Sequence, residues 1–331
     1  MELNHETLNL VLSKMLHKTI FNATYQLNKM QAGSVGEVYL ITGMAESTDC
    51  DKIPYKIVLK KQKKWDRQDD IDSWRREYDL YSSNLDDLFA DSIHRPKCYH
   101  AEISDTEMQI WMEYIGGVTA MNLTSEMYEQ VATELGRFQG KIYNNTPIQL
   151  QKLKNLSKID AFKNAYKYFK SLCGVYEYIR SDSCEIPKHL CDMLIDTDNN
   201  AEDIWNCVSK LPIVLCHRDP FVWNVFVTDN TVTYIDWDSA GWGYMGEDIV
   251  NLLADDVDVD NILEYYHKCV PAYCNGFAQY ADISHISNIY IIERIIMHFG
   301  YRLADSYMRA KSSEEKMRDL AILQKFFEIT N

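Results

Sequence analysis

Four polar residues lie in and after short apolar runs in the second half of the chain: His217, Asp219, Asn224 and Asp236. A carboxylate can orient and deprotonate an acceptor hydroxyl, whereas amide and carboxylate oxygens hold magnesium on nucleotide phosphates. Asp219 suits the first task, and Asn224 together with Asp236 suits the second. These residue types and their spacing therefore predict a site that transfers a phosphoryl group.

The spacing resembles a pair of motifs, His-x-Asp-x-x-x-x-Asn and then Ile-Asp-Trp-Asp, the second of which spans 235–238 in this chain. Both occur in this order in the aminoglycoside phosphotransferase and choline kinase family, which shares the protein-kinase-like fold. The turn Gly-Glu-Asp-Ile at 246–249 is also similar to that family. The resemblance implies a kinase that uses ATP or GTP with Mg²⁺. Asp219 would be its catalytic residue, with Asn224 and Asp236 as metal ligands.

The resemblance also implies supporting roles for three further residues. His217 would brace the catalytic loop, and Asp238 would position that loop or contact a second magnesium ion. Asp248 would anchor the loop through hydrogen bonds to its backbone. The two tryptophans of this region, Trp223 and Trp237, are expected to be packing residues.

The resembled fold is an α+β fold with two lobes. Residues 1–115 are expected to form a small nucleotide-binding lobe with five short antiparallel strands, one main helix and a hinge at its end. Residues 116–331 are expected to form a larger, mostly helical lobe with the catalytic loop and the acceptor pocket. Apolar residues at helical spacing predict one helix within the first 20 residues and another from Thr124 to Lys141. A hairpin from Val225 to Ile235 would carry the magnesium-side residues.

A turn that contains glycine lies between two strand-like runs, 24–29 and 38–42. Gly33 and Gly36 permit close approach of the backbone to phosphates, and Ser34 adds a hydroxyl donor. Gln31 replaces the first glycine of the resembled loop. The segment is predicted to cover the nucleotide phosphates, although an ordinary hairpin turn has the same composition.

The strand-like run 55–60 ends at Lys60, which resembles the lysine that contacts the α- and β-phosphates in kinases. The adjacent Lys61 would point to the other face of the sheet because side chains alternate along a strand. Glu77 lies on a predicted helix spanning 71–81 and is the expected partner of Lys60. A solvated lysine pair and a solvated helix face are the alternatives for these positions.

The run 109–117 resembles the passage from a strand into the hinge of these kinases. Backbone groups near Glu113 and Ile115 would pair with the nucleotide base, and the apolar residues before them would form the floor of its slot. Gly116 and Gly117 would let the chain cross between the lobes. A strand that ends at a Gly-Gly turn is the alternative.

Composition agrees with a soluble cytoplasmic enzyme, and a monomer or a dimer is expected. The chain of 331 residues has a net charge of −15, which argues against nucleic-acid binding and favours a small cationic acceptor. No run of about 18 apolar residues is present and the first residues lack signal-peptide features, so neither membrane insertion nor export is expected. The nine cysteines form no C-x-x-C pair and are interpreted as reduced thiols.

Acidic residues gather in two regions, 182–203 and 255–260. In the resembled family, residues from these helical regions commonly build the acceptor pocket. Each of the carboxylates is also explained by a solvated surface, which is the usual place of acidic runs. The two regions are therefore candidates for the acceptor pocket.

Differences from protein kinases reduce the classes of acceptor that this chain is expected to phosphorylate. Phe221 stands where protein kinases place a lysine, and only eleven residues separate Asp236 from Asp248. That segment is too short to dock a peptide, so a small acceptor is expected, with aminoglycoside-like antibiotics favoured. Choline- or ethanolamine-type amines, sugars and a nucleotide-binding pseudokinase with a regulatory role are the alternatives. Arg218 matches the His-Arg-Asp motif of protein kinases, and its role stays open.

Overall fold

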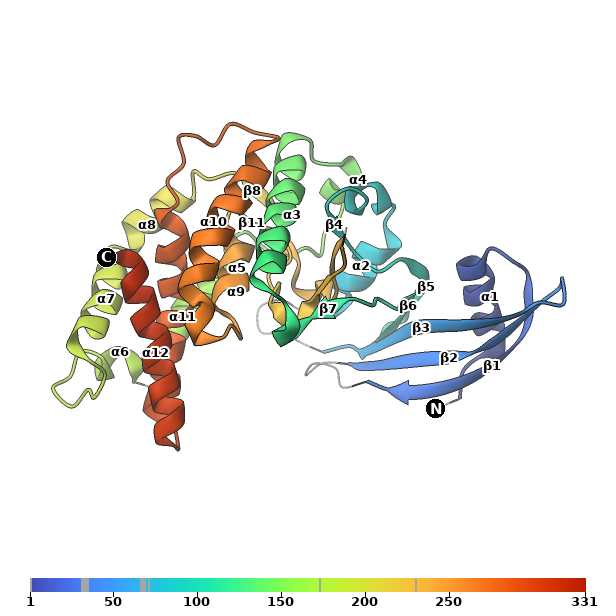
Figure 1. Ribbon diagram of the computed structural model, residues 1–331, viewed down its shortest axis with the longest axis horizontal. Coiled ribbons are helices and arrows are strands. Elements are labelled where there is room, and N and C mark those ends of the chain that lie inside the picture. The colour runs from blue at the N-terminus through green and yellow to red at the C-terminus, as the bar shows by residue number, and fades with distance from the viewer. Residues whose placement is uncertain (1, 31–35, 66–69, 71, 173, 230) are drawn as a thin grey trace.

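Two regions with different architecture make up the protein (Figure 1), as a computed structural model shows. The structure describes residues 2–30, 36–65, 70, 72–172, 174–229 and 231–331. A sheet with a helix against it forms the N-terminal region, and a group of helices with short strands forms the rest. This arrangement confirms the predicted α+β fold with a five-stranded antiparallel sheet and a helical C-terminal part.

The N-terminal sheet has the strand order β1-β2-β3-β6-β5 and every neighbouring pair is antiparallel. Its strands are β1 (Ile20–Lys29), β2 (Glu37–Ser47), β3 (Lys52–Lys63), β5 (Cys98–Ile103) and β6 (Glu107–Glu113). The first three contain 10, 11 and 12 residues, so the prediction of short strands was wrong for them. Their continuous pairing with each other extends them well past the apolar runs that signalled them.

Side chains on the two faces of this sheet belong to two separate apolar clusters. One face packs against helix α1 (His5–Leu16), whose Leu8, Val11 and Leu12 are fully buried. The other face carries Met108, Ile110 and Met112 of β6. These three residues pack with Trp74 and Tyr81 around the second helix of the region. Both faces of the sheet are therefore covered, which fixes the register of β3 and the direction of each of its side chains.

The helix that carries Glu77 is shorter than the predicted span 71–81. A 3₁₀ turn, η1 (Ser73–Arg75), comes first, and helix α2 (Arg76–Ser82) follows it. The buried face of α2 contains Arg76, Glu77, Leu80 and Tyr81. This face includes two charged side chains, so the helix is not the solvated one that was the alternative.

Ten helices build the described C-terminal region: α3 (Ser125–Asn144), α4 (Ile148–Gln151), α5 (Ala161–Lys170), α6 (Val175–Tyr178), α7 (Lys188–Asn199), α8 (Ala201–Val208), α9 (Glu247–Ala254), α10 (Ile262–Ala278), α11 (Ile289–Arg309) and α12 (Ser313–Thr330). The side chain of Thr124 caps α3 by accepting a hydrogen bond from Met127 N. Helices α3 and α10 approach very closely, because a Cβ at Gly136 would lie only 2.0 Å from Tyr273 O. Within the described residues, no helix has the length and apolar composition needed to span a membrane.

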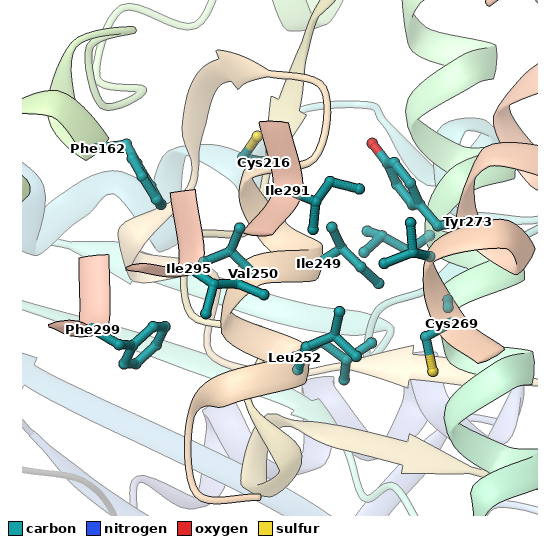
Figure 2. Packing of buried hydrophobic residues seen from close by; sticks show 14 of the residues in the cluster. Phe162, Cys216, Ile249, Val250, Leu252, Cys269, Tyr273, Ile291, Ile295 and Phe299 are labelled. Carbon is teal, nitrogen blue, oxygen red and sulfur yellow. The ribbon is translucent and has the colours of Figure 1, made fainter. Parts of the chain in front are cut away.

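Helix α9 lies at the centre of the C-terminal core (Figure 2). Its residues Ile249, Val250 and Leu252 are fully buried. They face side chains from α10 and α11, among them Tyr273 and Ile295. Because α9 is fixed on several sides, polar side chains at its N-terminus have well-defined positions.

Short strands complete the C-terminal region: β4 (Ile93–His94), β7 (Val118–Thr119), β8 (Ile213–Cys216), β9 (Val225–Val227), β10 (Val232–Tyr234) and β11 (Gly241–Tyr244). The predicted hairpin is present, with Val227 opposite Val232 in the antiparallel pair β9 and β10. Strand β4 joins this sheet although it precedes the hinge in sequence. Residues 80–93 thus contribute to the C-terminal core, and the expected division at residue 115 stays a prediction.

Candidate active site

A cavity of about 570 Å³ brings together residues that are far apart in the sequence. Strands β3 and β6, helix α2 and the loops around β9 and β10 supply its walls. It is lined by eight of the predicted site residues: Lys60, Glu77, Glu113, Ile115, Asp219, Asn224, Asp236 and Asp238. Gly33 and Ser34 lie outside the described residues, and Gly36, His217 and Asp248 do not line the cavity.

Lys60 is held between two carboxylates inside this cavity. Its Nζ lies 2.5 Å from Glu77 Oε2 and 2.5 Å from Asp236 Oδ1, and its side chain is only 9 % exposed. Burial alone would lower the pKa of Lys60, but the charges of Asp236 and Glu77 outweigh burial and raise it well above its ordinary value. Lys60 is therefore a fixed positive charge, and α2 is tied to the segment that carries Asp236.

Glu77 is almost completely buried beside that lysine. Burial raises its pKa above the ordinary value, although the charge of Lys60 acts in the opposite direction. Its Oε1 also accepts a hydrogen bond from Trp237 N at 3.3 Å. Glu77 thus touches the residue that follows Asp236, which couples the position of α2 to the position of the predicted metal ligand.

Asp219 and Asn224 lie on the same loop and are joined directly by hydrogen bonds. Asn224 Nδ2 donates to Asp219 O at 2.9 Å and to Asp219 Oδ2 at 3.0 Å, from the 3₁₀ turn η4 (Val222–Asn224). The pKa of Asp219 is raised to about 7, first by burial and then by the negative charges of Asp236, Asp238 and Asp255. A carboxylate whose pKa lies near neutrality has the properties of a general base.

His217 lies under the loop and contacts backbone on both sides. Its Nε2 donates to Ile235 O at 2.9 Å, and its Nδ1 accepts from Asp219 N at 3.2 Å. Both contacts agree with one neutral tautomer, and burial lowers the pKa of His217 to about 4. A neutral ring that bridges Asp219 and the strand end before Asp236 fits the bracing role implied by the resemblance.

Asp248 connects the loop to the core helix α9. Its Oδ2 accepts from His217 N at 2.8 Å, and its Oδ1 accepts from Arg218 N at 2.8 Å. Gln139 Nε2 adds a third hydrogen bond at 2.9 Å. These contacts are the backbone hydrogen bonds that the resemblance implies for Asp248, and the loop therefore takes its position from α9.

The oxygen atoms near Asp236 suit a magnesium ion that is also bound by phosphates. Asn224 uses its amide nitrogen for Asp219, so its Oδ1 is the atom left for a cation. Asp236 has a left-handed backbone conformation, φ 62°, and lines the cavity together with Asp238. Within the described ranges, no group of three or more His, Cys, Asp or Glu side chains is arranged to hold a metal alone. The donor set fits a cation that takes its remaining ligands from a nucleotide and water.

The expected hinge borders the apolar end of the cavity. Val38, Val58 and Met112 line this end together with Glu113 and Ile115. The backbone N–H of Glu113 already donates to Lys97 O at 2.9 Å. At Gly117, φ is 136° and a Cβ would lie 2.8 Å from Val227 O, so the chain needs glycine where it passes strand β9.

One expectation for this region needs correction. Trp237 is 1 % exposed and packs against His217, as predicted, but Trp223 is 53 % exposed and lines the cavity. The prediction of packing for Trp223 was therefore wrong. Alternation within so short a segment gave no signal, because the 3₁₀ turn that contains it rotates Trp223 outward while Asn224 stays buried.

The two acidic regions differ in their relation to the site. In the first, Asp198 pairs with Lys170 and Arg180, and no residue of 182–203 lines the cavity of Asp219. In the second, Asp255 is close enough to Asp219 to raise its pKa. Of the two regions, only the second therefore acts on Asp219. No sequence signal separated Asp255 from the acidic residues around it.

Comparison with protein families gives an independent result. The model of a phosphotransferase enzyme family matches residues 87–283, which is more than half of the chain. The chain belongs to this family. It is therefore a small-molecule phosphotransferase, and the resemblance inferred from its motifs is confirmed. Comparison with curated protein sequences finds no match.

Solved structures with the same fold cover nearly the whole phosphotransferase chain. A choline kinase from Cryptosporidium parvum aligns with a TM-score of 0.56 at 16 % identity, over 92 % of this chain and 90 % of that one. An amicoumacin kinase, solved with AMP-PNP and Ca²⁺, aligns with a TM-score of 0.54 at 14 % identity, over 97 % and 93 %. APH(2")-IIa in complex with gentamicin aligns with a TM-score of 0.51 at 16 % identity, over 99 % of each chain. At these identities the likeness establishes the fold.

Proposed function

We propose that this phosphotransferase moves the γ-phosphoryl group of ATP or GTP to a hydroxyl of a small cationic acceptor, with Mg²⁺ as cofactor. The observation that carries the proposal is the convergence of Lys60, Glu77, Asp219, Asn224 and Asp236 on one cavity. Each has the chemistry that one part of phosphoryl transfer requires. The nucleotide would lie between residues 1–115 and 116–331, with its base against the backbone of Glu113 and Ile115.

In the proposed mechanism, Asp219 accepts a hydrogen bond from the acceptor hydroxyl and takes its proton as the phosphoryl group is transferred. Lys60 contacts the α- and β-phosphates and is kept charged and in place by Glu77. Bound magnesium would neutralise charge on the β- and γ-phosphates, and Asn224 and Asp236 would hold it. Most of the rate enhancement would come from positioning and charge neutralisation, because the protein forms no covalent intermediate.

Charge around the catalytic residue supports a cationic acceptor. The carboxylates of Asp236, Asp238 and Asp255 are all close enough to Asp219 to raise its pKa. The negative field of these carboxylates attracts ammonium groups and concentrates cationic molecules near Asp219, where the hydroxyl of the acceptor would lie. Aminoglycoside-like molecules carry several ammonium groups beside hydroxyls, and one related fold was solved with gentamicin bound. We favour this class over choline-type amines, which carry a single charge, and over neutral sugars.

A coupled assay of nucleotide-diphosphate release tests the proposal. The protein is incubated with Mg²⁺ and either ATP or GTP against aminoglycosides, choline, ethanolamine and simple sugars, with Asp219→Asn as the matched control. Release that depends on a cationic acceptor and is lost in Asp219→Asn is expected. Tight nucleotide binding without any acceptor-dependent release would instead favour the pseudokinase alternative. Release that depends only on neutral sugars would refute the cationic acceptor while leaving the kinase activity in place.

A further inference from the structure

Arg218 has an unusual position inside the catalytic loop, between His217 and Asp219. Its φ is 68°, in the left-handed region that glycine adopts readily and that other residues adopt at a cost in free energy. Its side chain is nevertheless only 9 % exposed. Because this backbone conformation is unfavourable and the side chain is buried, we expect contacts of the side chain to offset the cost.

The guanidinium of Arg218 makes three contacts with three different parts of the protein. Nη1 donates to Ser157 Oγ at 2.5 Å, and Nη2 donates to Trp242 O. Nε lies 3.5 Å from Glu247 Oε2, and the Glu247 side chain is only 2 % exposed. Asn251, from the same helix as Glu247, donates to Arg218 O at 3.0 Å. The residue therefore binds the loop to helix α9 through both its side chain and its backbone.

The contact with Ser157 leads to a segment that we call the strap, residues 155–158. Ser157 N donates to Ala240 O at 3.0 Å, and Ser157 O accepts from Trp242 N at 3.1 Å. Between them, Gly241 approaches so closely that a Cβ there would lie 2.0 Å from Ser157 Oγ. The strap is thus held tightly against the chain that directly follows the predicted metal ligand Asp236.

A second buried arginine fastens the other end of the strap. Arg76 is 1 % exposed, and its Nε donates to Asn155 O at 2.6 Å. Its Nη1 donates to Asp238 O at 2.7 Å. Arg76 directly precedes Glu77, the partner of Lys60. The strap therefore contacts the helix of Glu77, the segment of Asp236 and Asp238, and the loop of Asp219.

We propose that Arg218 is a positioning residue for phosphoryl transfer, which holds Asp219 in place by locking the catalytic loop to the strap and to helix α9. The proposal rests on the proposed function. Arg218 does not line the cavity that contains Asp219, and it borders a second cavity of about 980 Å³ together with the strap. Its guanidinium therefore acts through the loop and touches neither the nucleotide nor the transferred group.

The test compares substitutions that all suit the left-handed backbone or keep the charge. Arg218→Gly and Arg218→Asn tolerate the positive φ but remove the guanidinium contacts, and Arg218→Lys keeps a cation that can reach one of the partners. Arg180→Gln is the matched control, because Arg180 pairs with the buried Asp198 at 3.0 Å and lines neither cavity. Melting temperature, kcat and the KM for the nucleotide are measured for each.

We expect kcat of Arg218→Gly and Arg218→Asn to fall by about 10- to 100-fold, the effect of a misplacement of about 1 Å at a catalytic group. The KM for the nucleotide should stay near that of the wild type, because the contacts of Lys60 and the hinge are unchanged. Arg218→Lys should recover part of kcat, and Arg180→Gln should lower the melting temperature but not kcat. Wild-type kcat in Arg218→Asn would overturn the proposal, as would an equal loss of kcat in Arg180→Gln.

Hydrogen exchange separates this proposal from the proposed function, since it needs no acceptor. Amide exchange is measured by mass spectrometry on peptides that cover 213–227, in the wild type and in Arg218→Asn. Faster exchange across the catalytic loop, without faster exchange in α7, supports the positioning role. If no acceptor is turned over by the wild type, the proposed function fails while the exchange result still decides. Unchanged loop exchange in Arg218→Asn would contradict the positioning role.

Discussion

The pH dependence of catalysis follows from the environment of Asp219. Its pKa of about 7 is set by burial and by the charges of Asp236, Asp238 and Asp255, against an ordinary value of 3.8. Because a general base must be ionised, kcat/KM for the nucleotide should rise with pH and level off above about pH 8. With a pKa of about 7, roughly half of Asp219 is ionised at pH 7 and about 1 % at pH 5, so kcat/KM should fall about 50-fold between these values. With the ordinary pKa the fall would be less than about 10 %.

Two neighbouring carboxylates provide a matched pair for this experiment. Asp255 raises the pKa of Asp219, whereas Asp256 is exposed and acts on Asp255. Asp255→Asn should therefore move the acidic limb of the profile to lower pH, and Asp256→Asn should move it much less. The profiles are recorded at one fixed Mg²⁺ concentration, with circular dichroism at each pH to confirm that the protein stays folded. A flat profile from pH 5 to 8 in the wild type would refute the reasoning.

Three further substitutions test separate parts of the structure. Lys60→Met should reduce kcat by about 100-fold or more, because a charge that would face the phosphates is removed. Calorimetry should show a melting temperature close to that of the wild type, since Glu77 can be protonated once Lys60 is absent. Gly136→Ala should destabilise the fold by about 1–3 kcal/mol or more in urea unfolding, because its Cβ would lie 2.0 Å from Tyr273 O; unchanged unfolding would mean that α3 and α10 can separate without loss. Asp248→Asn should cost about 1–3 kcal/mol in the same assay, because its amide NH₂ cannot accept from a buried loop N–H, and a neutral result would show that the loop has another anchor.

The parts of the site that could be predicted from sequence are those whose chemistry is local. Asp219 and Asn224 are five residues apart on one loop, and a single 3₁₀ turn brings the amide to the carboxylate. Asp236 lies two residues after the end of β10, and pairing of β9 with β10 carries it back to that loop. The spacing alone thus specifies their meeting, because only one hairpin separates them.

The strap could not be predicted, because nothing in its own residues indicates its role. Ser157 is important through the partners that meet it, Arg218 at one side and Gly241 at the other, which lie 61 and 84 positions away. Short polar segments such as 155–158 usually form ordinary loops. The proposed role of the strap depends on long-range packing of α2 and α9. A local pattern of residue types does not predict such packing.

The charges of the cleft constrain how a nucleotide can bind. Glu77, Asp219, Asp236 and Asp238 line the cavity together, and Lys60 is the only cation among the described lining residues. A free triphosphate would meet a negative field there, and burial makes that repulsion stronger than it would be in water. A nucleotide that arrives with a divalent cation would bring the missing positive charge to the oxygens of Asn224 and Asp236. We therefore expect the field that would favour a cationic acceptor to favour entry of the phosphoryl donor as its metal complex.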